Sequence, residues 1–417
     1  MATRPESGIA TSPQLAAKGL ILLSFIVALE IVIMISPFAL FFYAVFNPFL
    51  LALAHAPATR WLTAFFLPHM IVPPNAVLAA IRIAGSVFFA LGVSAFLICA
   101  MQVYVGKLWK AGVATKGLYA VVRHPQYVAL AVAGAGLAIM WPRFLTLVLF
   151  GVMLFLYYLL AKDEERRMLA RCGDSYRAYM DRTGMFLPRF AEALLPGQGR
   201  TDRRFTTGKL VALPFLLLDV SVGSGFALRT YTIDHLPLAS IGGIDVIAIT
   251  TEDVEAAREL LPSVLQDPAV VTRLPGATGR EGHRLLSYVI PIDYTMQGMI
   301  ADTGEEWRLF EQHKTIGMLT EYIVHPFAHL TEGHAHRATP HASGMSAHDS
   351  PAMKRRIIFV DVSSGTRPLK SSRDAFAIDV RRTPRFFVDV HLHTGEVLQV
   401  KDIPSGSGWG TVPTPTF

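Results

Sequence analysis

The sequence predicts an α-helical integral membrane bundle of about five transmembrane helices, followed by a small α+β soluble domain. The chain of 417 residues is 52% hydrophobic and only 17% charged, whereas about a quarter of the residues in soluble proteins are charged. The apolar excess lies in blocks before about residue 161 and in one further block near residues 210–228. The rest of the C-terminal part has the shorter apolar patterns of soluble strands and helices.

Two long apolar segments are predicted to cross the membrane as single helices. Residues 20–46 are broken only by Glu30 and exceed the roughly 20 residues that a crossing needs. The competing interpretation is a secretory signal, but the run is too long for the apolar core of one. Residues 81–105 carry no charge after Arg82 and form the second predicted span.

A third apolar segment, residues 128–161, is interrupted near its middle by Trp141-Pro142-Arg143. One long helix and a helical hairpin both fit its length. Proline breaks a helix and arginine avoids the bilayer centre, so the sequence favours the hairpin. Residues 48–67 contain His55 and Arg60, and the choice between crossing the membrane and lying along its surface stays open.

The distribution of basic residues predicts the orientation. Residues 162–209 contain eleven Lys and Arg, and residues 105–123 contain four more. Because Lys and Arg gather in cytoplasmic loops, both segments are expected to face the cytoplasm of a bacterial inner (plasma) membrane. The apolar run 210–228 then crosses back, which puts residues 230–417 outside the cytoplasm. The bilayer accounts for the net charge of +6, so we expect no nucleic-acid partner.

The last 190 residues or so read as a soluble α+β domain. Residues 244–250 and 357–362 are β-like runs, and residues 386–393 alternate as FFVDVHLH. Residues 252–265 have the period of an amphipathic helix. The mixture predicts a small sheet with at least one helix against it.

The residues that carry chemistry lie on both sides of the predicted hairpin. They are Gly117, Tyr119, Arg123-His124-Pro125-Gln126-Tyr127, Glu164-Glu165, Gly173, Tyr176 and Tyr179. Over roughly residues 80–190 this pattern resembles the isoprenylcysteine carboxyl methyltransferase family and its membrane relatives, the phospholipid and small-thiol methyltransferases. The resemblance implies an integral membrane methyltransferase that uses S-adenosylmethionine.

The side chains suit that cofactor. Arg123 and His124 can hold its carboxylate with charge-assisted hydrogen bonds, and Glu164 or Glu165 can take its ammonium or ribose hydroxyls. The resemblance points to Glu164 as the ligand. The full predicted cofactor set is Tyr119, Arg123, His124, Pro125, Gln126, Tyr127, Glu164 and Glu165. A plainer interpretation makes the arginine and histidine a juxtamembrane cap before a helix that starts at proline.

Two departures from the family pattern bear on the methyl acceptor. The family usually has glycine two residues after the motif tyrosine, where this chain has Ala129. The prenylcysteine enzymes have an arginine shortly before the glutamate pair, where this chain has Leu160. A prenylated peptide is therefore a poor candidate. The expected acceptor is a lipid or a small hydrophobic thiol or carboxylate.

A second candidate site is a histidine-rich segment in the C-terminal part. Met345 and Met353 lie among or beside these histidines. Imidazole and thioether ligands together suit copper, and imidazole alone suits zinc. An ordinary solvated loop is an equally weighted interpretation. The candidate ligands are His325, His329, His334, His336, His341 and His348.

Three domains follow from these patterns. Residues 1–200 form the methyltransferase-like membrane domain, residues 201–229 a basic linker with a further transmembrane helix, and residues 230–417 the extracytoplasmic domain. The favoured function is S-adenosylmethionine-dependent methyl transfer in the membrane. The alternatives are a metal-handling or regulatory membrane protein with an inert methyltransferase fold, and a membrane sterol-type reductase.

Overall fold

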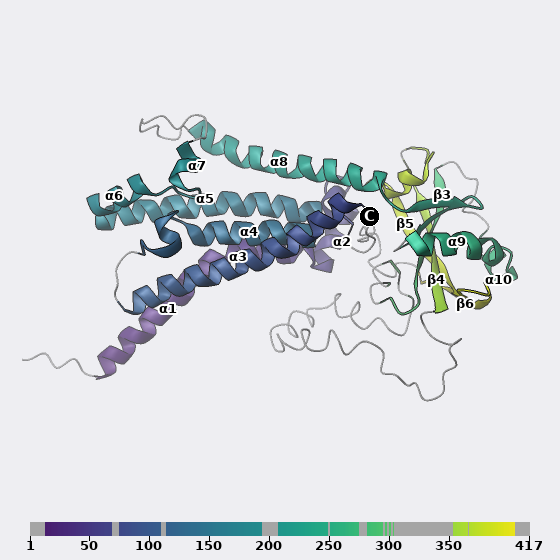
Figure 1. The fold of residues 1–417 in the computed structure, drawn as a ribbon, viewed down its shortest axis with the longest axis horizontal. Coiled ribbons are helices and arrows are strands. Elements are labelled where there is room, and N and C mark those ends of the chain that lie inside the picture. Colours follow the sequence, from purple (N-terminus) through teal and green to yellow (C-terminus); the bar gives the residue numbers. More distant parts are fainter. Residues whose placement is uncertain are drawn as a thin grey trace, which may run out of the picture. The chain divides into compact units, whose positions relative to one another are not determined.

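The computed structural model describes most of the chain, and its elements are traced in Figure 1. The described residues are 13–68, 75–109, 114–193, 207–248, 251–274, 282–294, 297, 300, 301, 303, 353–365 and 367–404. They fall into two compact units. Unit 1 combines Met1–Leu40, Ala90–Gly134 and Val152–Thr206, and unit 2 combines Phe41–Phe89, Ala135–Gly151 and Thr207–Phe417.

Three of the described segments are long and apolar enough to cross a membrane. They are Ser24–Ala44, which begins in α1 (Pro13–Ala39), Ala76–Lys107 in α3 (Ala76–Leu108), and α5 (Phe144–Cys172). They support the predicted helical membrane bundle, but the predicted number of about five spans is not confirmed. Helix α4 (Pro125–Met140) is apolar but has only 16 residues. Helix α8 (Thr207–Asp234) covers the predicted run 210–228 with 28 residues and is not among the three.

The predicted hairpin is confirmed, because α4 ends at Met140 and α5 begins at Phe144. Pro142 cannot continue a helix, since its nitrogen has no hydrogen to donate. The corner is held by residues from an earlier segment of the chain: the Arg143 guanidinium donates to the carbonyl of Thr63, and its central carbon, Cζ, lies 4.1 Å from the Phe65 ring centre. The interrupting arginine thus has a structural role at the corner.

Residues 48–67 do not cross as a helix. Helix α2 (Asn47–His55) has nine residues, a rise of about 14 Å, which is less than half of the hydrocarbon core. Its residues Leu50 and Ala54 belong to the same buried cluster as Ile247 and Ile358 of the C-terminal sheet. The segment is therefore part of the core of unit 2.

In the C-terminal part of unit 2, the described residues form a six-stranded sheet in sequential order. The strands are β1 (Leu238–Ile241), β2 (Ile244–Ala248), β3 (His283–Pro291), β4 (Lys354–Ser363), β5 (Arg381–His391) and β6 (Val397–Asp402). Among the described strands, only β2 and β3 pair in parallel, and α9 (Thr251–Val264) and α10 (Pro268–Val271) lie in the crossover between them. The predicted sheet in the C-terminal part, with a helix packed against it, is confirmed.

The sheet is buried on both faces, because alternate residues of its strands enter different clusters. Ile357 of β4 packs with Leu260 and Leu261 of α9 on one face. Its neighbour Ile358 packs on the other face with Leu50 of α2. This alternation follows the period of two of a β-strand.

Candidate active site

The candidate site lies in unit 1 and is built where the chain enters α4. Residues 117–120 make a single 3₁₀ turn, and Val122 then forms an isolated parallel β-bridge with Gly184. The backbone NH of Arg123 donates to the carbonyl of Gly184 at 2.8 Å, and α4 begins at Pro125. Proline favours the first turn of a helix, where its missing NH costs nothing. The motif side chains are thereby fixed at the start of α4.

Arg123 is held by a buried set of hydrogen bonds to Glu165, Met180 and Thr183, which we call the clamp. Its Nε donates to Oε1 of Glu165 at 2.6 Å, and the two side chains are only 9% and 4% exposed. Its NH1 donates to the carbonyl of Met180 at 3.0 Å and also to that of Thr183. One guanidinium therefore ties α4, α5 and the end of α6 (Asp174–Arg182) together. These donors already have acceptors within the protein, so the geometry favours a positioning role for this arginine.

His124 lies between the two motif glutamates. Its Nδ1 is 3.3 Å from Oε2 of Glu164, and its Nε2 is 3.6 Å from Oε1 of Glu165. Burial alone lowers the pKa of His124, but the two carboxylates outweigh this effect and raise the pKa above its ordinary value. The buried Nε2 has no hydrogen-bond partner among the described residues. The two carboxylates therefore stabilise the protonated form of this imidazole.

A pH dependence of stability follows from this raised pKa. The stabilisation from charged His124 is fully present below the unfolded value of about 6.5 and is lost as the pH rises through the folded pKa. We expect the melting temperature of the full chain in detergent to fall from pH 6 to about pH 9 by more than that of His124→Asn. Parallel curves for the two proteins over this range would show that the histidine does not carry the linkage.

Glu164 is the more accessible of the two carboxylates. Its side chain is 34% exposed, against 4% for Glu165. The hydroxyl of Tyr127 donates to Oε1 of Glu164 at 2.6 Å and fixes the carboxylate on one side. The Tyr127 ring stacks on Tyr157 of α5, with ring centres 5.0 Å apart. The arrangement offers one oriented, partly exposed negative charge beside an aromatic stack.

Tyr157 was not predicted as a site residue. It is almost fully buried, and its hydroxyl has no hydrogen-bond partner among the described residues. It lies seven residues before Glu164, which is two turns of the same helix and hence the same face. That spacing is the signal in the sequence that could have found it.

Tyr179 on α6 holds the turn at residues 117–120 in place. Gly173 has φ +55°, a left-handed conformation that side chains rarely adopt, and it separates α5 from α6. The hydroxyl of Tyr179 donates to the carbonyl of Tyr119 at 2.5 Å. The hydroxyl of Tyr119 in turn donates to the amide oxygen of Gln126. Burial raises the pKa of Tyr119, which keeps this hydroxyl protonated and able to donate.

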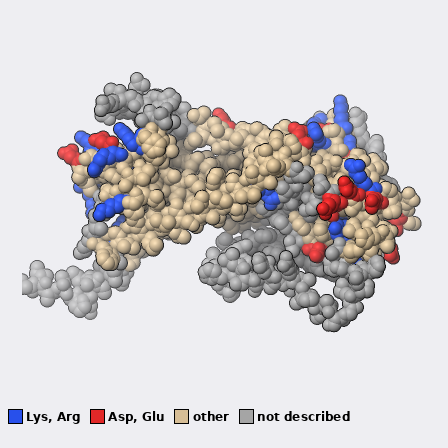
Figure 2. Space-filling view, viewed as in Figure 1, with Lys and Arg blue, Asp and Glu red and all other residues tan. Residues whose placement is uncertain are grey.

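Basic residues surround this end of unit 1. Figure 2 shows Lys and Arg gathered over α6 and the adjoining end of α5, beside helical surface without charge. Arg166 and Arg167 both pair with Asp163 on the exposed side of α5, at 2.5 Å and 3.0 Å. Such exposed pairs contribute little to stability.

The structure brings all eight predicted cofactor residues to one end of unit 1. Six of them share the contacts just described, while Pro125 starts the helix and Gln126 orients Tyr119. The predicted metal ligands between residues 325 and 348 lie outside the described residues. Within the described part of the chain, no group of three His, Cys, Asp or Glu could hold a metal ion.

Comparison with known proteins supports the same segment. Residues 69–173 match the sequence model of the phospholipid methyltransferase family. The match includes Arg123 to Tyr127 and both motif glutamates, so the family resemblance of this segment is confirmed. It implies a membrane methyltransferase and, generally, use of S-adenosylmethionine. No curated protein and no solved structure matches the chain.

Proposed function

We propose that this methyltransferase segment binds S-adenosylmethionine against His124, Tyr127 and Glu164 and directs its methyl group to a lipid or other hydrophobic acceptor. The proposal rests on the different burial and contacts of two adjacent glutamates, Glu164 and Glu165. Glu165 is buried and neutralised by Arg123, whereas Glu164 is partly exposed and held in one orientation. The second carboxylate is thus oriented in advance for a cationic or hydroxylated ligand.

The residues fit the cofactor on chemical grounds. The ammonium or the ribose hydroxyls can donate to the exposed oxygens of Glu164, which accept charge-assisted hydrogen bonds. The buried Nε2 of His124 is a polar atom with no hydrogen-bond partner among the described residues. The aromatic faces of Tyr127 and Tyr157 can attract a cationic group. We assign Arg123 to positioning, since its bonds to Glu165 and to the carbonyls at the end of α6 set the geometry.

S-adenosylmethionine supplies a methyl group already activated on a positive sulfur. In the transfer, the bond from sulfur to the methyl carbon breaks as the bond from the acceptor atom to that carbon forms, and sulfur keeps the electron pair. Any proton on the acceptor atom then leaves to a base or water. This chemistry needs alignment and exclusion of water more than a strong base. The buried aromatic stack and the clamp at Arg123 serve those two needs.

Transfer of radiolabelled methyl groups tests this proposal. Purified full chain in nanodiscs of mixed bacterial lipids should move label from S-adenosylmethionine into the organic phase. Glu164→Ala should abolish most of this transfer, whereas the matched control Asp163→Ala, one residue earlier on α5, should retain it. No transfer by wild-type protein that binds the cofactor would favour the inert-fold alternative.

We also propose the orientation predicted from charge, with α6 in the cytoplasm and the sheet outside it. In a Cys172→Ser background, we introduce Ser175→Cys on α6 and, separately, Thr394→Cys in the turn between β5 and β6; both sites are exposed. An impermeant thiol reagent on intact cells should modify only Thr394→Cys. Modification of Ser175→Cys alone would reverse the topology, and modification of neither in intact cells but both after lysis would place the sheet in the cytoplasm.

A further inference from the structure

Residues 184–192 form a loop after α6 that contacts the candidate site. The carbonyls of its first two residues, Gly184 and Met185, accept hydrogen bonds from the backbone NH groups of Arg123 and His124, at 2.8 Å and 3.2 Å. The loop therefore runs alongside the start of α4, and its side chains can act on the motif residues there.

Phe186 of this loop extends a row of aromatic rings. Its ring centre lies 5.9 Å from that of His124, and the His124 ring stacks on Tyr127 at 5.8 Å. Tyr127 in turn stacks on Tyr157 of α5. Packing against neighbouring side chains restricts the rotamers of a site residue. Phe186 thus helps to fix the orientation in which the imidazole meets the two motif glutamates.

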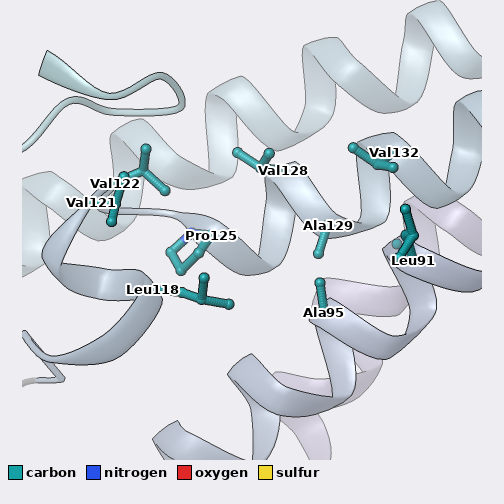
Figure 3. A pocket seen from close by; sticks show the side chains of 10 residues that line it. Leu91, Ala95, Leu118, Val121, Val122, Pro125, Val128, Ala129 and Val132 are labelled. Atoms are coloured by element: carbon teal, nitrogen blue, oxygen red, sulfur yellow. The ribbon is translucent and has the colours of Figure 1, made fainter. Parts of the chain in front are cut away.

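The apolar pocket beside the start of α4 gives His124 no comparable support. Leu118, Val122 and Pro125 are among the residues that line it, and the side chains that Figure 3 shows around it contain only carbon. Such side chains have no hydrogen-bonding groups. The orientation of His124 therefore depends on its other neighbours, which are the glutamates of α5, Tyr127 and the 184–192 loop.

Glu192 closes the loop. It lies in the short helix α7 (Arg189–Ala193), and its Oε1 accepts a hydrogen bond from the backbone NH of Met185 at 2.6 Å. A Cβ at Gly184 would lie 1.8 Å from a backbone oxygen of the same loop and 2.8 Å from Cδ of Glu192, so the loop folds back tightly on its own start. Met185 joins Glu192 to His124, because its NH donates to the carboxylate and its carbonyl accepts from the histidine.

We infer that Glu192 is a positioning residue of the cofactor site, which holds Phe186 against His124 through its bond to Met185. The inference rests on the proposed function and adds to it a residue outside the segment 69–173 that matches the family model. Glu192 bonds to a backbone NH, which carries no full charge. Its role therefore needs an oxygen acceptor and not a negative charge, and glutamine should replace it.

Calorimetric titration of S-adenosylmethionine into the full chain in detergent tests the inference. Glu192→Ala should raise the dissociation constant about 3- to 10-fold, the effect of losing one hydrogen bond, with the number of sites per chain unchanged. Glu192→Gln and the matched control Asp181→Ala, which removes an exposed carboxylate of α6, should keep the wild-type constant. An unchanged constant in Glu192→Ala, an equal loss in Glu192→Gln, or fewer sites per chain at an unchanged constant would each overturn the inference.

A double variant shows whether Glu192 acts through the histidine. In a His124→Ala background, Glu192→Ala should change the dissociation constant by less than about twofold, because the imidazole that the loop positions is absent. Phe186→Leu should weaken binding in the wild-type background and not in this one. Effects of His124→Ala and Glu192→Ala that multiply in full would place the action of Glu192 elsewhere and contradict the inference.

Melting curves need no cofactor, so they separate this inference from the proposed function. His124 keeps its raised pKa only while it lies between Glu164 and Glu165. Glu192→Ala should therefore lose part of the fall in melting temperature from pH 6 to about pH 9 that distinguishes the wild type from His124→Asn, whereas Glu192→Gln should keep it. A wild-type fall in Glu192→Ala would overturn the inference even if the cofactor binds. The expected curves from a wild-type protein that binds no cofactor would support the loop contact and refute the proposed function alone.

Discussion

Glu165→Ala is expected to lower the free energy of unfolding by about 3–5 kcal/mol, the largest effect of any single substitution at the site. The substitution leaves the guanidinium of Arg123 buried without its carboxylate, and the remaining carbonyl acceptors carry no full charge. Unfolding of the full chain in mixed detergent micelles, followed by intrinsic fluorescence, measures the change.

Two further variants separate the ion pair from general damage at this position. The double substitution Arg123→Met with Glu165→Leu removes both charges, and a buried pair replaced by apolar residues is often neutral for stability. We therefore expect the double variant to be more stable than Glu165→Ala. Asp163→Ala, which removes an exposed carboxylate two residues away, should change stability by about 1 kcal/mol or less. Equal losses in all three variants would mean that the clamp has no special role.

Glu164→Ala and His124→Ala are each expected to weaken S-adenosylmethionine binding by about 1–3 kcal/mol, the usual cost of losing a hydrogen bond to a charged group. This corresponds to about 5-fold to 150-fold in the dissociation constant. Glu164→Ala should lower the free energy of unfolding by less than Glu165→Ala does, because the Glu164 side chain is one-third exposed and not part of the clamp. Isothermal titration calorimetry on purified protein gives the constants.

Glu164→Gln refines this expectation. Glutamine keeps an oxygen that can accept from Tyr127 but carries no charge, so the loss in affinity reports the contribution of charge alone. We expect an intermediate affinity for this variant. Unchanged affinity in both Glu164→Ala and His124→Ala would remove these residues from the cofactor site.

The hairpin could be predicted from sequence because its signals are local. Pro142 and Arg143 mark the corner: α4 ends before them, at Met140, and α5 begins after them, at Phe144. The role of Arg123 could not be predicted in the same way. Its carbonyl acceptors on Met180 and Thr183 are 57 and 60 residues along the chain, and backbone acceptors leave no trace in side-chain patterns.

The sheet was predicted only where strands alternate or are strongly apolar. Strand β3 was missed, because it is buried on both faces from Leu285 to Ile290 and lacks alternation. Strand β6 was missed because it is largely exposed at the sheet edge. The predicted number of about five spans stays unconfirmed for a related reason: hydropathy finds apolar runs, but whether a run becomes a helix long enough to cross depends on where proline and tertiary contacts end it.

Direct binding of S-adenosylmethionine to the purified full chain tests the central claim most directly. Calorimetry with wild-type protein in detergent should give saturable binding, competed by S-adenosylhomocysteine and weakened by Glu164→Ala but not by Asp163→Ala. Reduced nicotinamide adenine dinucleotide phosphate, added in a parallel titration, should give no heat of binding. Saturable binding of the nicotinamide cofactor without any binding of S-adenosylmethionine would contradict the account and favour the reductase alternative.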